Sequence, residues 1–180
     1  MNNLIGLTGK AGVGKDTVAR ILVDEYGYTR IAFADALKTA LEVVDPVIDM
    51  VCEDRLTETL YEKDRTWDDI KQIPEVRRLL QNLGTAIRDI DPLFWIRAAD
   101  IPADGVSRVV VADVRLLSEV SEIKNKGGIV YRVVRPDVRA VREHHTETEL
   151  DSYLFPVIEN SGTLDDLRTT VKEMMNGCIR

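Results

Sequence analysis

Residues Gly9–Asp16, which spell G-K-A-G-V-G-K-D, constrain the fold of this chain more than any other segment. They follow the apolar run Leu4–Leu7 and precede a helical pattern, which is the strand–loop–helix setting of a phosphate-binding loop. Glycines permit a tight turn whose backbone N–H groups point at an anion, and the positive end of the following helix dipole adds to the attraction. Lys15 brings a full charge for the outer phosphates. A mere tight turn is the alternative, but the flanks and Lys15 favour binding of a nucleoside triphosphate.

One position departs from the usual form of such loops. Asp16 stands where a Ser or Thr hydroxyl normally contacts Mg²⁺, and Thr17 comes one residue later. The residues predicted to surround the triphosphate are Gly9, Lys10, Ala11, Gly12, Val13, Gly14, Lys15, Asp16 and Thr17.

Size and charge exclude several classes of protein. The chain has 180 residues, which predicts one domain with a single core. It carries 24 basic against 31 acidic residues, a net charge of −7, which argues against a surface for duplex nucleic acid. No apolar run approaches the ~20 residues of a membrane span, and no signal peptide is expected. Cys52 and Cys178 lie far apart in the sequence and are interpreted as incidental thiols in a cytosolic protein.

Strand and helix patterns alternate along the chain, which is typical of a parallel sheet covered on both faces. The predicted strands are Leu4–Thr8, Thr29–Phe33, Arg108–Asp113, Ile129–Val134 and Pro156–Ile158. The predicted helices are Gly14–Tyr26, Asp35–Val44, Glu75–Arg88, about Pro92–Asp100, about Leu116–Lys126 and a last one that opens at Thr163. Leu164, Leu167, Val171 and Met174 or Met175 would form the inner stripe of that last helix. Residues 46–73 are the least periodic, and we expect there an insertion over the sheet edge, part helical and part mobile, that could pair two copies.

The helix predicted over residues 75–88 has a polar stripe opposite its leucines. Arg77, Gln81, Gly84 and Arg88 share one face of it. An ordinary solvated face is the simpler interpretation. Two guanidiniums and an amide, however, match a monophosphate and a base edge. Gly84 costs helix stability and therefore indicates that something approaches closely there.

Asp113 follows the valine-rich strand Arg108–Asp113, at the carboxyl end where parallel sheets bind ligands. In phosphate-loop enzymes an Asp at this place holds Mg²⁺ or its water. The alternative is that Asp113 caps the next turn. Arg115 and Glu119 could face the same cleft or be plain surface.

Residues 135–151 are polar and rich in arginine. Arg135, Arg139 and Arg142 would stack on one side of a helix that begins at Pro136, either as a solvated surface or as a cover over the transferring group. The adjacent His144 and His145 could hold a metal or act as a general base, but neighbouring side chains diverge on a helix, which argues against a catalytic role. Asn160, in the turn after the last strand, would lie near an adenine or serve only turn chemistry.

Taken together, several separated motifs resemble the bacteriophage-type deoxynucleoside monophosphate kinases, which are similar in turn to dephospho-coenzyme A kinases and adenylate kinases. The motifs are G-x-x-x-x-G-K-D-T (Gly9–Thr17), F-A-D-A-L-K (Phe33–Lys38), R-x-x-L-Q-x-L-G-T (Arg77–Thr85), D-P-x-F-W (Asp91–Trp95), V-A-D-V-R (Val111–Arg115) and N-S-G-T (Asn160–Thr163). The likeness covers nearly the whole chain, and Asp16-Thr17 after the lysine is its most distinctive part.

The resemblance implies Mg²⁺-dependent transfer of the γ-phosphoryl group of ATP to a deoxynucleoside monophosphate. It implies catalytic roles for Lys15, Asp16, Arg135 and Arg139, and metal contacts for Asp16, Thr17 and Asp113. It places the acceptor against Phe33, Asp35, Lys38, Arg77, Gln81, Arg88 and Trp95, and it adds Asn160 to the ATP-binding residues.

The predicted fold is therefore α/β: a three-layer P-loop NTPase fold with a parallel five-stranded sheet flanked by helices. Its core would be residues 1–45 and 105–180, with an acceptor-binding helical region over about 46–104 and an arginine-rich lid over about 135–151. The alternatives are a dephospho-coenzyme A kinase or other small-molecule kinase, a GTP-binding switch, and a catalytically silent ATP-binding module. The expected partners are small nucleotides, without nucleic acid or membrane, and a homodimer is possible. The expected location is the cytoplasm, that of the host if the gene is of phage origin.

Overall fold

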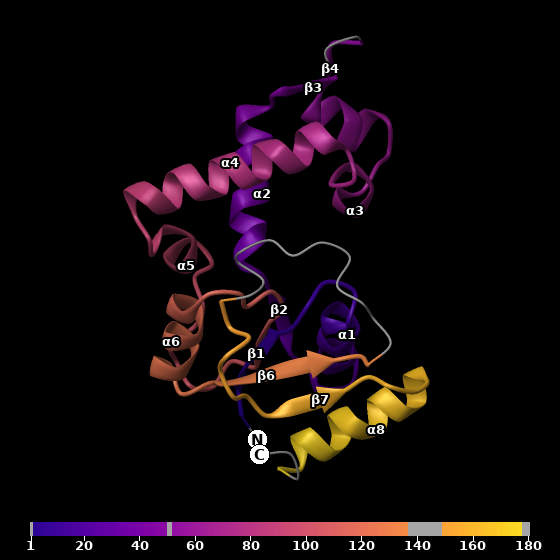
Figure 1. The fold of residues 1–180 in the computed structure, drawn as a ribbon, viewed down its shortest axis with the longest axis vertical. Coiled ribbons are helices and arrows are strands. Elements are labelled where there is room, and N and C mark those ends of the chain that lie inside the picture. The colour runs from indigo at the N-terminus through magenta and orange to yellow at the C-terminus, as the bar shows by residue number, and fades with distance from the viewer. Residues whose placement is uncertain (1, 50–51, 137–148, 178–180) are drawn as a thin grey trace. The chain divides into compact units, whose positions relative to one another are not determined.

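The computed structural model describes residues 2–49, 52–136 and 149–177, and the chain divides into two compact units (Figure 1). The first, here called the sheet unit, comprises Met1–Phe33 and Asp100–Arg180. The second, the helical unit, comprises Ala34–Ala99 and so begins earlier than the predicted acceptor-binding region. That both units act as one kinase domain stays a prediction.

The sheet unit is built on the predicted five-stranded parallel sheet, with strand order β2-β5-β1-β6-β7. The strands are β1 (Leu4–Thr8), β2 (Thr29–Ile31), β5 (Val109–Val111), β6 (Ile129–Val134) and β7 (Val157–Glu159). In the centre, Ile5 of β1 pairs with Val110 on one side and Ile129 on the other. All five residues of β1 are buried, as expected for a strand covered on both faces.

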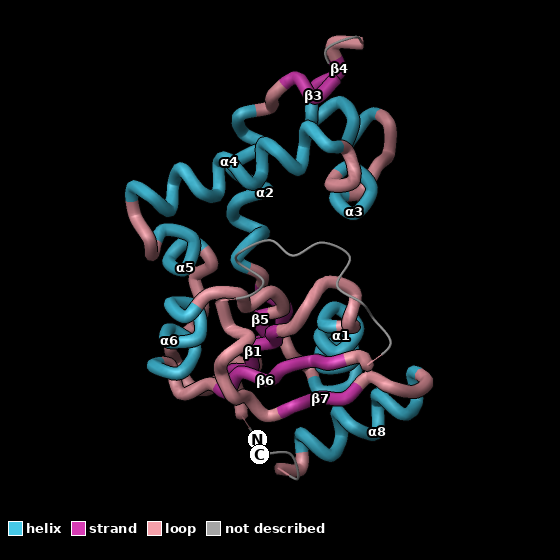
Figure 2. Tube along the Cα trace, viewed as in Figure 1, coloured by secondary structure: helices cyan, strands magenta, loops and turns pink. Residues whose placement is uncertain are grey.

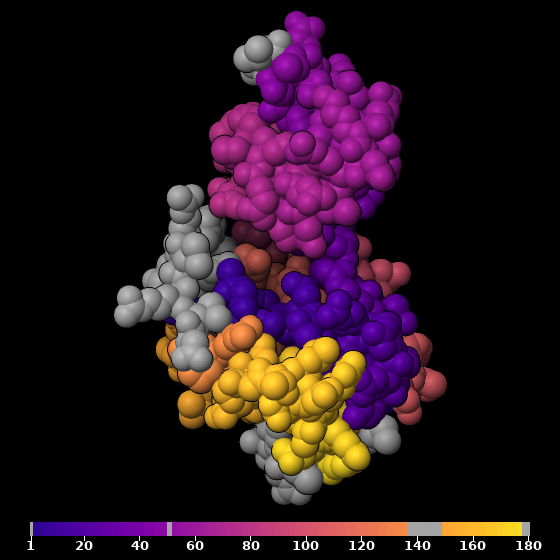
Figure 3. Space-filling view, turned by 90° about the vertical axis from the view of Figure 1, so that its right-hand side faces the viewer, coloured from indigo at the N-terminus to yellow at the C-terminus, as the bar shows by residue number. Residues whose placement is uncertain are grey.

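Helices cover both faces of this sheet (Figure 2). They are α1 (Lys15–Tyr26), α6 (Leu117–Asn125) and α8 (Leu164–Met175). Because side chains alternate along a strand, Ile5 and Leu7 join the core under α1 and α8, whereas Gly6 faces Ile123 of α6. Figure 3 shows α8 against the N-terminal part of the sheet unit, and α1 and α8 pack together. The three-layer prediction is confirmed.

The ends of these helices follow local chemistry. Gly27 ends α1 with φ 69°, a left-handed conformation suited to glycine. At the start of α8 the Thr163 hydroxyl accepts from the N–H of Asp166, whose carboxylate accepts from the N–H of Thr163, which confirms the predicted cap. Leu164 was expected in the inner stripe of α8, and that was wrong: its spacing puts it on the same face as Leu167 and Val171, but it is the first residue of the helix and is 44% exposed.

The helical unit has more elements than the sequence predicts. They are α2 (Phe33–Val44), β3 (Val47–Asp49), β4 (Asp54–Arg55), the π-helix η1 (Glu58–Glu62), α3 (Trp67–Ile70), α4 (Pro74–Ile90) and α5 (Phe94–Ala98). The strand expected over Thr29–Phe33 ends at Ile31, because Phe33 already begins α2. The core of the unit consists of Leu41, Ile48, Leu56, Leu60, Ile70 and Val76.

Polar contacts at the end of α2 organise the aperiodic segment that follows. The Asp45 carboxylate accepts from both the backbone N–H and the hydroxyl of Thr57, each at 2.9 Å, and the Arg55 guanidinium donates to the Asp45 carbonyl at 2.7 Å. One turn earlier, Glu42 accepts from the Tyr61 hydroxyl and the Trp67 indole N–H, both at 2.7 Å. These side chains join α2 to β4, η1 and α3, in a segment without the apolar repeat that predicts elements.

Candidate active site

The loop between β1 and α1 has the backbone that its glycines predict. Gly9, Gly12 and Gly14 have φ values of 136°, 79° and 104°, which side-chain-bearing residues rarely adopt. At Gly9 there is also no room, because an added Cβ would lie 2.4 Å from the carbonyl oxygen of Val133. The loop therefore requires glycine at these places, and it leads directly into the N-terminus of α1, the end of a helix that favours anions.

Lys15 lies within this loop. Its ammonium donates to the carbonyl oxygens of Gly9 at 2.6 Å and of Lys10 at 2.9 Å. The positive charge is thereby held at the loop itself. Asp16 and Thr17 occupy the first turn of α1, where Asp16 is exposed.

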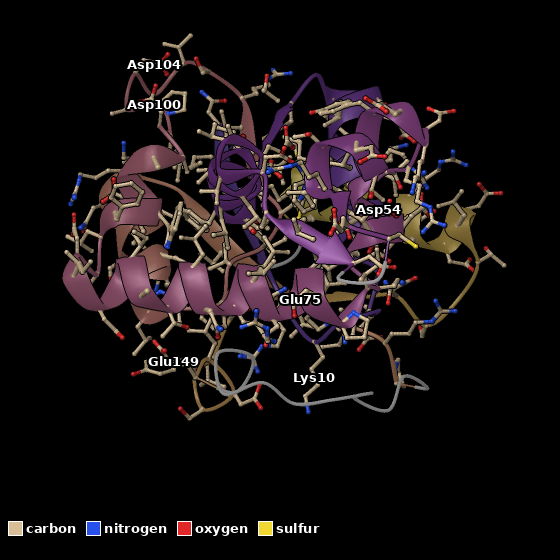
Figure 4. The ribbon with its side chains drawn as sticks, turned by 90° about the horizontal axis from the view of Figure 1, so that it is seen from above. Lys10, Asp54, Glu75, Asp100, Asp104 and Glu149 are labelled. Atoms are coloured by element: carbon tan, nitrogen blue, oxygen red, sulfur yellow. The ribbon has the colours of Figure 1, made fainter. Side chains whose placement is uncertain are left out.

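A cavity of about 230 Å³ adjoins the phosphate loop. One side is lined by Gly9, Lys10 and Val13, and the other by the end of β6 with Arg135 and by Leu150 and Asp151. In Figure 4 the Lys10 side chain extends away from the ribbon. The structure thus brings the predicted Arg135 to the same cavity as the start of the phosphate loop.

Arg132 of β6 orders the far wall of the cavity. Its guanidinium donates to the carbonyl oxygens of Leu150, of Asp151 at 3.4 Å and of Tyr153 at 3.2 Å, and lies 5.3 Å from the ring centre of Phe155. The sequence does not predict this role of Arg132, because an arginine in a strand gives no sign of which carbonyls its side chain will contact.

Asp113 lies just beyond β5, at the carboxyl edge of the sheet, as predicted. One of its carboxylate oxygens accepts from the backbone N–H of Phe33 at 2.8 Å, at the first residue of α2. This hydrogen bond joins the end of β5 to the start of a helix far away in sequence. A carboxylate at a helix N-terminus is favoured by the helix dipole.

Glu119 serves the start of α6. It is 7% exposed and accepts from the backbone N–H groups of Arg115 at 2.6 Å and Leu116 at 3.0 Å. The N–H of Leu117 donates to Glu149 at 2.8 Å. The contacts of Glu119 thus fix the backbone two to three residues after Asp113. The residue Arg115 itself is exposed.

On α4 the predicted polar stripe is exposed at Arg77 and Gln81, and Arg77 donates to Gln72 at 3.3 Å. Gly84, in contrast, is buried: an added Cβ would lie 3.2 Å from Leu37 of α2, and the Trp95 indole donates to the Gly84 carbonyl at 3.1 Å. The predicted close approach at Gly84 is confirmed, and it comes from the chain itself.

The other residues predicted to contact the acceptor lie on α2, α4 and α5. Lys38 and Asp35 form an ion pair of 3.1 Å on α2, and Arg88 is half-buried in the last turn of α4. Trp95 is 6% exposed and lies edge-on to Phe94 at 4.9 Å between ring centres. Their contacts to a substrate stay predictions. Arg139, Arg142, His144, His145 and Cys178 lie outside the described residues, and Cys52 is a free, exposed thiol.

Two negative findings hold for the described ranges 2–49, 52–136 and 149–177. Within them no cluster of three or more His, Cys, Asp or Glu side chains could form a protein-only metal site. None of the helices there is long and apolar enough to cross a membrane.

Comparisons with known proteins agree with this geometry. The family model described as deoxynucleotide monophosphate kinase matches residues 47–171. A protein of Acanthamoeba polyphaga mimivirus named "Putative deoxynucleotide monophosphate kinase" is 31% identical over 165 residues, covering 83% of this chain and 82% of that protein. The deoxynucleotide monophosphate kinase of Enterobacteria phage T4 is 28% identical over 138 residues, covering 71% of this chain and 54% of the phage protein.

Among solved structures, the dephospho-CoA kinase from Campylobacter jejuni superposes with a TM-score of 0.51 at 15% identity. The match covers 99% of this chain and 98% of that one. At this identity the similarity concerns the fold alone.

Proposed function

Because this chain belongs to the deoxynucleotide monophosphate kinase family and is therefore a nucleotide kinase, we propose that it transfers the γ-phosphoryl group of ATP to a deoxynucleoside monophosphate. The observation that carries the proposal is the glycine-dependent loop with Lys15 held in it, in a chain whose other unit presents arginines on α4. The products would be ADP and the deoxynucleoside diphosphate.

The sheet unit would bind the donor. The N–H groups of the loop and of the first turn of α1 would donate to the phosphates, and Lys15 would leave the carbonyls of Gly9 and Lys10 to bridge the outer ones. The cavity beside Lys10 and Arg135 would take part of the nucleoside end of ATP, since it adjoins the start of the loop.

Mg²⁺ fits the oxygen donors that are present. Asp16 and Thr17 at the start of α1 and Asp113 at the edge of the sheet offer hard oxygen ligands, and Mg²⁺ usually takes one or two carboxylates plus waters and phosphate oxygens. When bound, the ion would neutralise charge on the phosphates.

The helical unit would bind the acceptor. Arg77 and Gln81 are exposed on one stripe of α4, with Arg88 about two turns beyond Gln81. A guanidinium donates two parallel N–H bonds to phosphate oxygens, and an amide can pair with a base edge. Lys38, in its pair with Asp35, would add a second cation near the monophosphate.

The reaction itself needs little covalent chemistry from the protein. An oxygen of the acceptor phosphate forms a bond to the γ phosphorus, and the bond from that phosphorus to the β–γ bridging oxygen breaks, with its electron pair leaving on ADP. Lys15 and the arginines Arg135 and Arg139 would stabilise the charge spread over the transferring group. No proton transfer is required when the acceptor phosphate is a dianion.

A coupled assay for ADP tests the proposal directly. The full chain is incubated with ATP, Mg²⁺ and, one at a time, the common deoxynucleoside and ribonucleoside monophosphates and dephospho-coenzyme A. We expect ADP formation with at least one deoxynucleoside monophosphate and none with dephospho-coenzyme A. ATP binding without product from any nucleotide would contradict the proposed reaction, and turnover of dephospho-coenzyme A alone would assign a different acceptor. A homodimer and a cytoplasmic location also stay predictions, the first open to size-exclusion chromatography with light scattering.

A further inference from the structure

Asn160 lies against the phosphate loop rather than in a simple surface turn. It follows β7, and its backbone N–H donates to the Val134 carbonyl at 2.8 Å, which continues the pairing of β7 with β6. Asn160 is buried, at 8% exposed, although its side chain is polar. The amide N–H donates to the carbonyl oxygen of Val13 at 2.9 Å.

The Val13 carbonyl needs such a donor. A loop that directs its N–H groups at an anion directs carbonyl groups away from it, and a buried carbonyl without a partner is costly. Val13 is 5% exposed, so water has little access to this peptide. The hydrogen bond from Asn160 therefore fixes the orientation of the peptide between Val13 and Gly14.

Gly14 shows how closely the Asn160 side chain supports the loop. A Cβ added to Gly14 would lie 2.4 Å from the Asn160 amide nitrogen, and the φ of Gly14 is 104°. The residue that follows is Lys15, the first of α1. Asn160 thus contacts the loop at the step where it turns into the helix.

We propose that Asn160 is a positioning residue for ATP: it fixes the peptide between Val13 and Gly14 so that the loop and the start of α1 hold their N–H groups toward the phosphates. This inference rests on the proposed function, because it deepens the donor side of that site. The Asn160 amide is thereby assigned to the loop, whereas the sequence left open a place near an adenine or simple turn chemistry.

Two substitutions test this role in the full chain. Asn160→Ala removes the donor, and Asn160→Asp keeps the shape while a carboxylate cannot donate to the Val13 carbonyl. Asn176→Asp, at the exposed end of α8, is the matched control for the added charge. Binding of ATP with Mg²⁺ is measured by calorimetry, well below the unfolding temperature of each variant, together with the KM of the fastest deoxynucleoside monophosphate acceptor.

We expect both Asn160 variants to bind ATP about tenfold more weakly, with the acceptor KM and the control unchanged. Hydrogen exchange should become faster in residues 9–14 and stay the same in β1 and β5. A general loss of structure would instead weaken ATP binding, raise the acceptor KM and speed hydrogen exchange in the sheet, all together. That result would overturn the proposal.

The outcomes separate the two levels of inference. If the wild-type chain binds no ATP, the proposed function fails and this proposal fails with it. If the wild-type chain binds ATP and both folded variants bind it equally well, only the role of Asn160 is refuted. Should Asn160→Ala not fold, the isosteric Asn160→Asp decides by the same criteria.

Discussion

The two units of this chain are held together by different means. The sheet unit has a parallel sheet whose central strand is buried along its whole length, with a core shared by α1 and α8. The helical unit has a smaller apolar core, and hydrogen bonds donated to the carboxylates of Glu42 and Asp45 tie its short elements to α2. One unit therefore depends mainly on apolar burial and a regular backbone, and the other adds side-chain hydrogen bonds to its core.

This difference extends to the way each unit can recognise phosphate. The sheet unit offers main-chain N–H groups, whose positions are set by the fold and by glycines that allow no side chain. The helical unit offers guanidiniums on long side chains, such as that of Arg77 on the exposed stripe of α4. Backbone donors need little reorganisation when charge develops, whereas side-chain donors lose conformational entropy but add specificity. We infer that catalysis depends most on the sheet unit and acceptor choice most on the helical unit.

The largest expected effect tests the sheet unit. Lys15→Ala should lower kcat/KM by at least about 10³-fold, because it removes the cation that bridges the outer phosphates. The thermal unfolding temperature should stay near that of the wild type, because the hydrogen bonds from the ammonium to the carbonyls of Gly9 and Lys10 lie within its own loop. The measurements are the ADP assay and circular dichroism on heating.

The control for that prediction is Lys172→Ala, which removes an exposed lysine of α8 and should leave activity unchanged. A folded Lys15→Ala protein with near wild-type turnover would show that the loop does not act as the catalytic phosphate site.

The second prediction asks whether the units are energetically separate. Ile70, fully buried in the core of the helical unit, is replaced by alanine, which should cost about 2–5 kcal/mol of stability. We expect hydrogen exchange to accelerate in residues 34–99 more than in the strands of the sheet unit. Denaturant unfolding and peptide-resolved exchange measure the two effects.

Ile90→Ala provides the matched control, since Ile90 is 82% exposed on α4 and its truncation should change stability little. Equal loss of protection in both units after Ile70→Ala would mean that they unfold as one body, and the comparison drawn above would fail.

The sequence predicted the sheet unit well for the same physical reasons. Buried strands and amphipathic helices leave periodic apolar patterns, so β1, α1 and the capped start of α8 were all expected near their observed bounds. The segment over residues 46–73 could not be predicted in detail, because its strands and its π-helix depend on Asp45 and Glu42 meeting partners that no repeat marks. The site shows the same division: the loop follows from its motif, whereas the contact of Asn160 with Val13 spans 147 residues and leaves no local signal.

A third, smaller effect tests the helical unit. Arg77→Ala should raise the acceptor KM about tenfold with kcat and the ATP KM nearly unchanged, because a phosphate contact that persists through the reaction contributes uniform binding. Steady-state kinetics with the acceptor and ATP varied in turn give the three values.

Arg78→Ala is its neighbour control. Arg78 is exposed on α4 and forms an ion pair of 2.6 Å with Glu75, so its loss should leave the acceptor KM as it is. If both substitutions raise the acceptor KM equally, the polar stripe of α4 does not bind the acceptor specifically.

The smallest expected effect is the response of the two units to low pH. Hydrogen bonds lower the pKa of five carboxyls of the helical unit. The main donors are Thr57 to Asp45, Lys71 to Asp68, Thr66 to Asp69, Arg78 to Glu75 and Arg97 to Asp91. In the sheet unit the pKa is lowered for Asp104 by Ser107 and for Asp166 by Thr163. A carboxyl whose pKa is lower in the folded than in the unfolded protein stabilises the fold when the pH is above its unfolded-state pKa. That stabilisation is lost as the pH falls through its folded-state pKa. On acidification below about pH 5, the helical unit should therefore lose hydrogen-exchange protection before the strands of the sheet unit.

Asp45 gives this prediction a single-residue form. The backbone N–H of Thr57 is the main cause of the lowered pKa of Asp45, and Asn can still accept that hydrogen bond without a charge. Asp45→Asn should thus be slightly less stable than the wild type at neutral pH, and the difference should narrow as the wild-type carboxyl becomes protonated. Asparagine also tolerates the φ of 46° at this position, so the backbone adds no cost. Denaturant unfolding at several pH values measures the difference in unfolding free energy between Asp45→Asn and the wild type, and Asp89→Asn on α4 is the exposed control. If that difference does not change with pH, the charge of Asp45 does not stabilise the segment after α2.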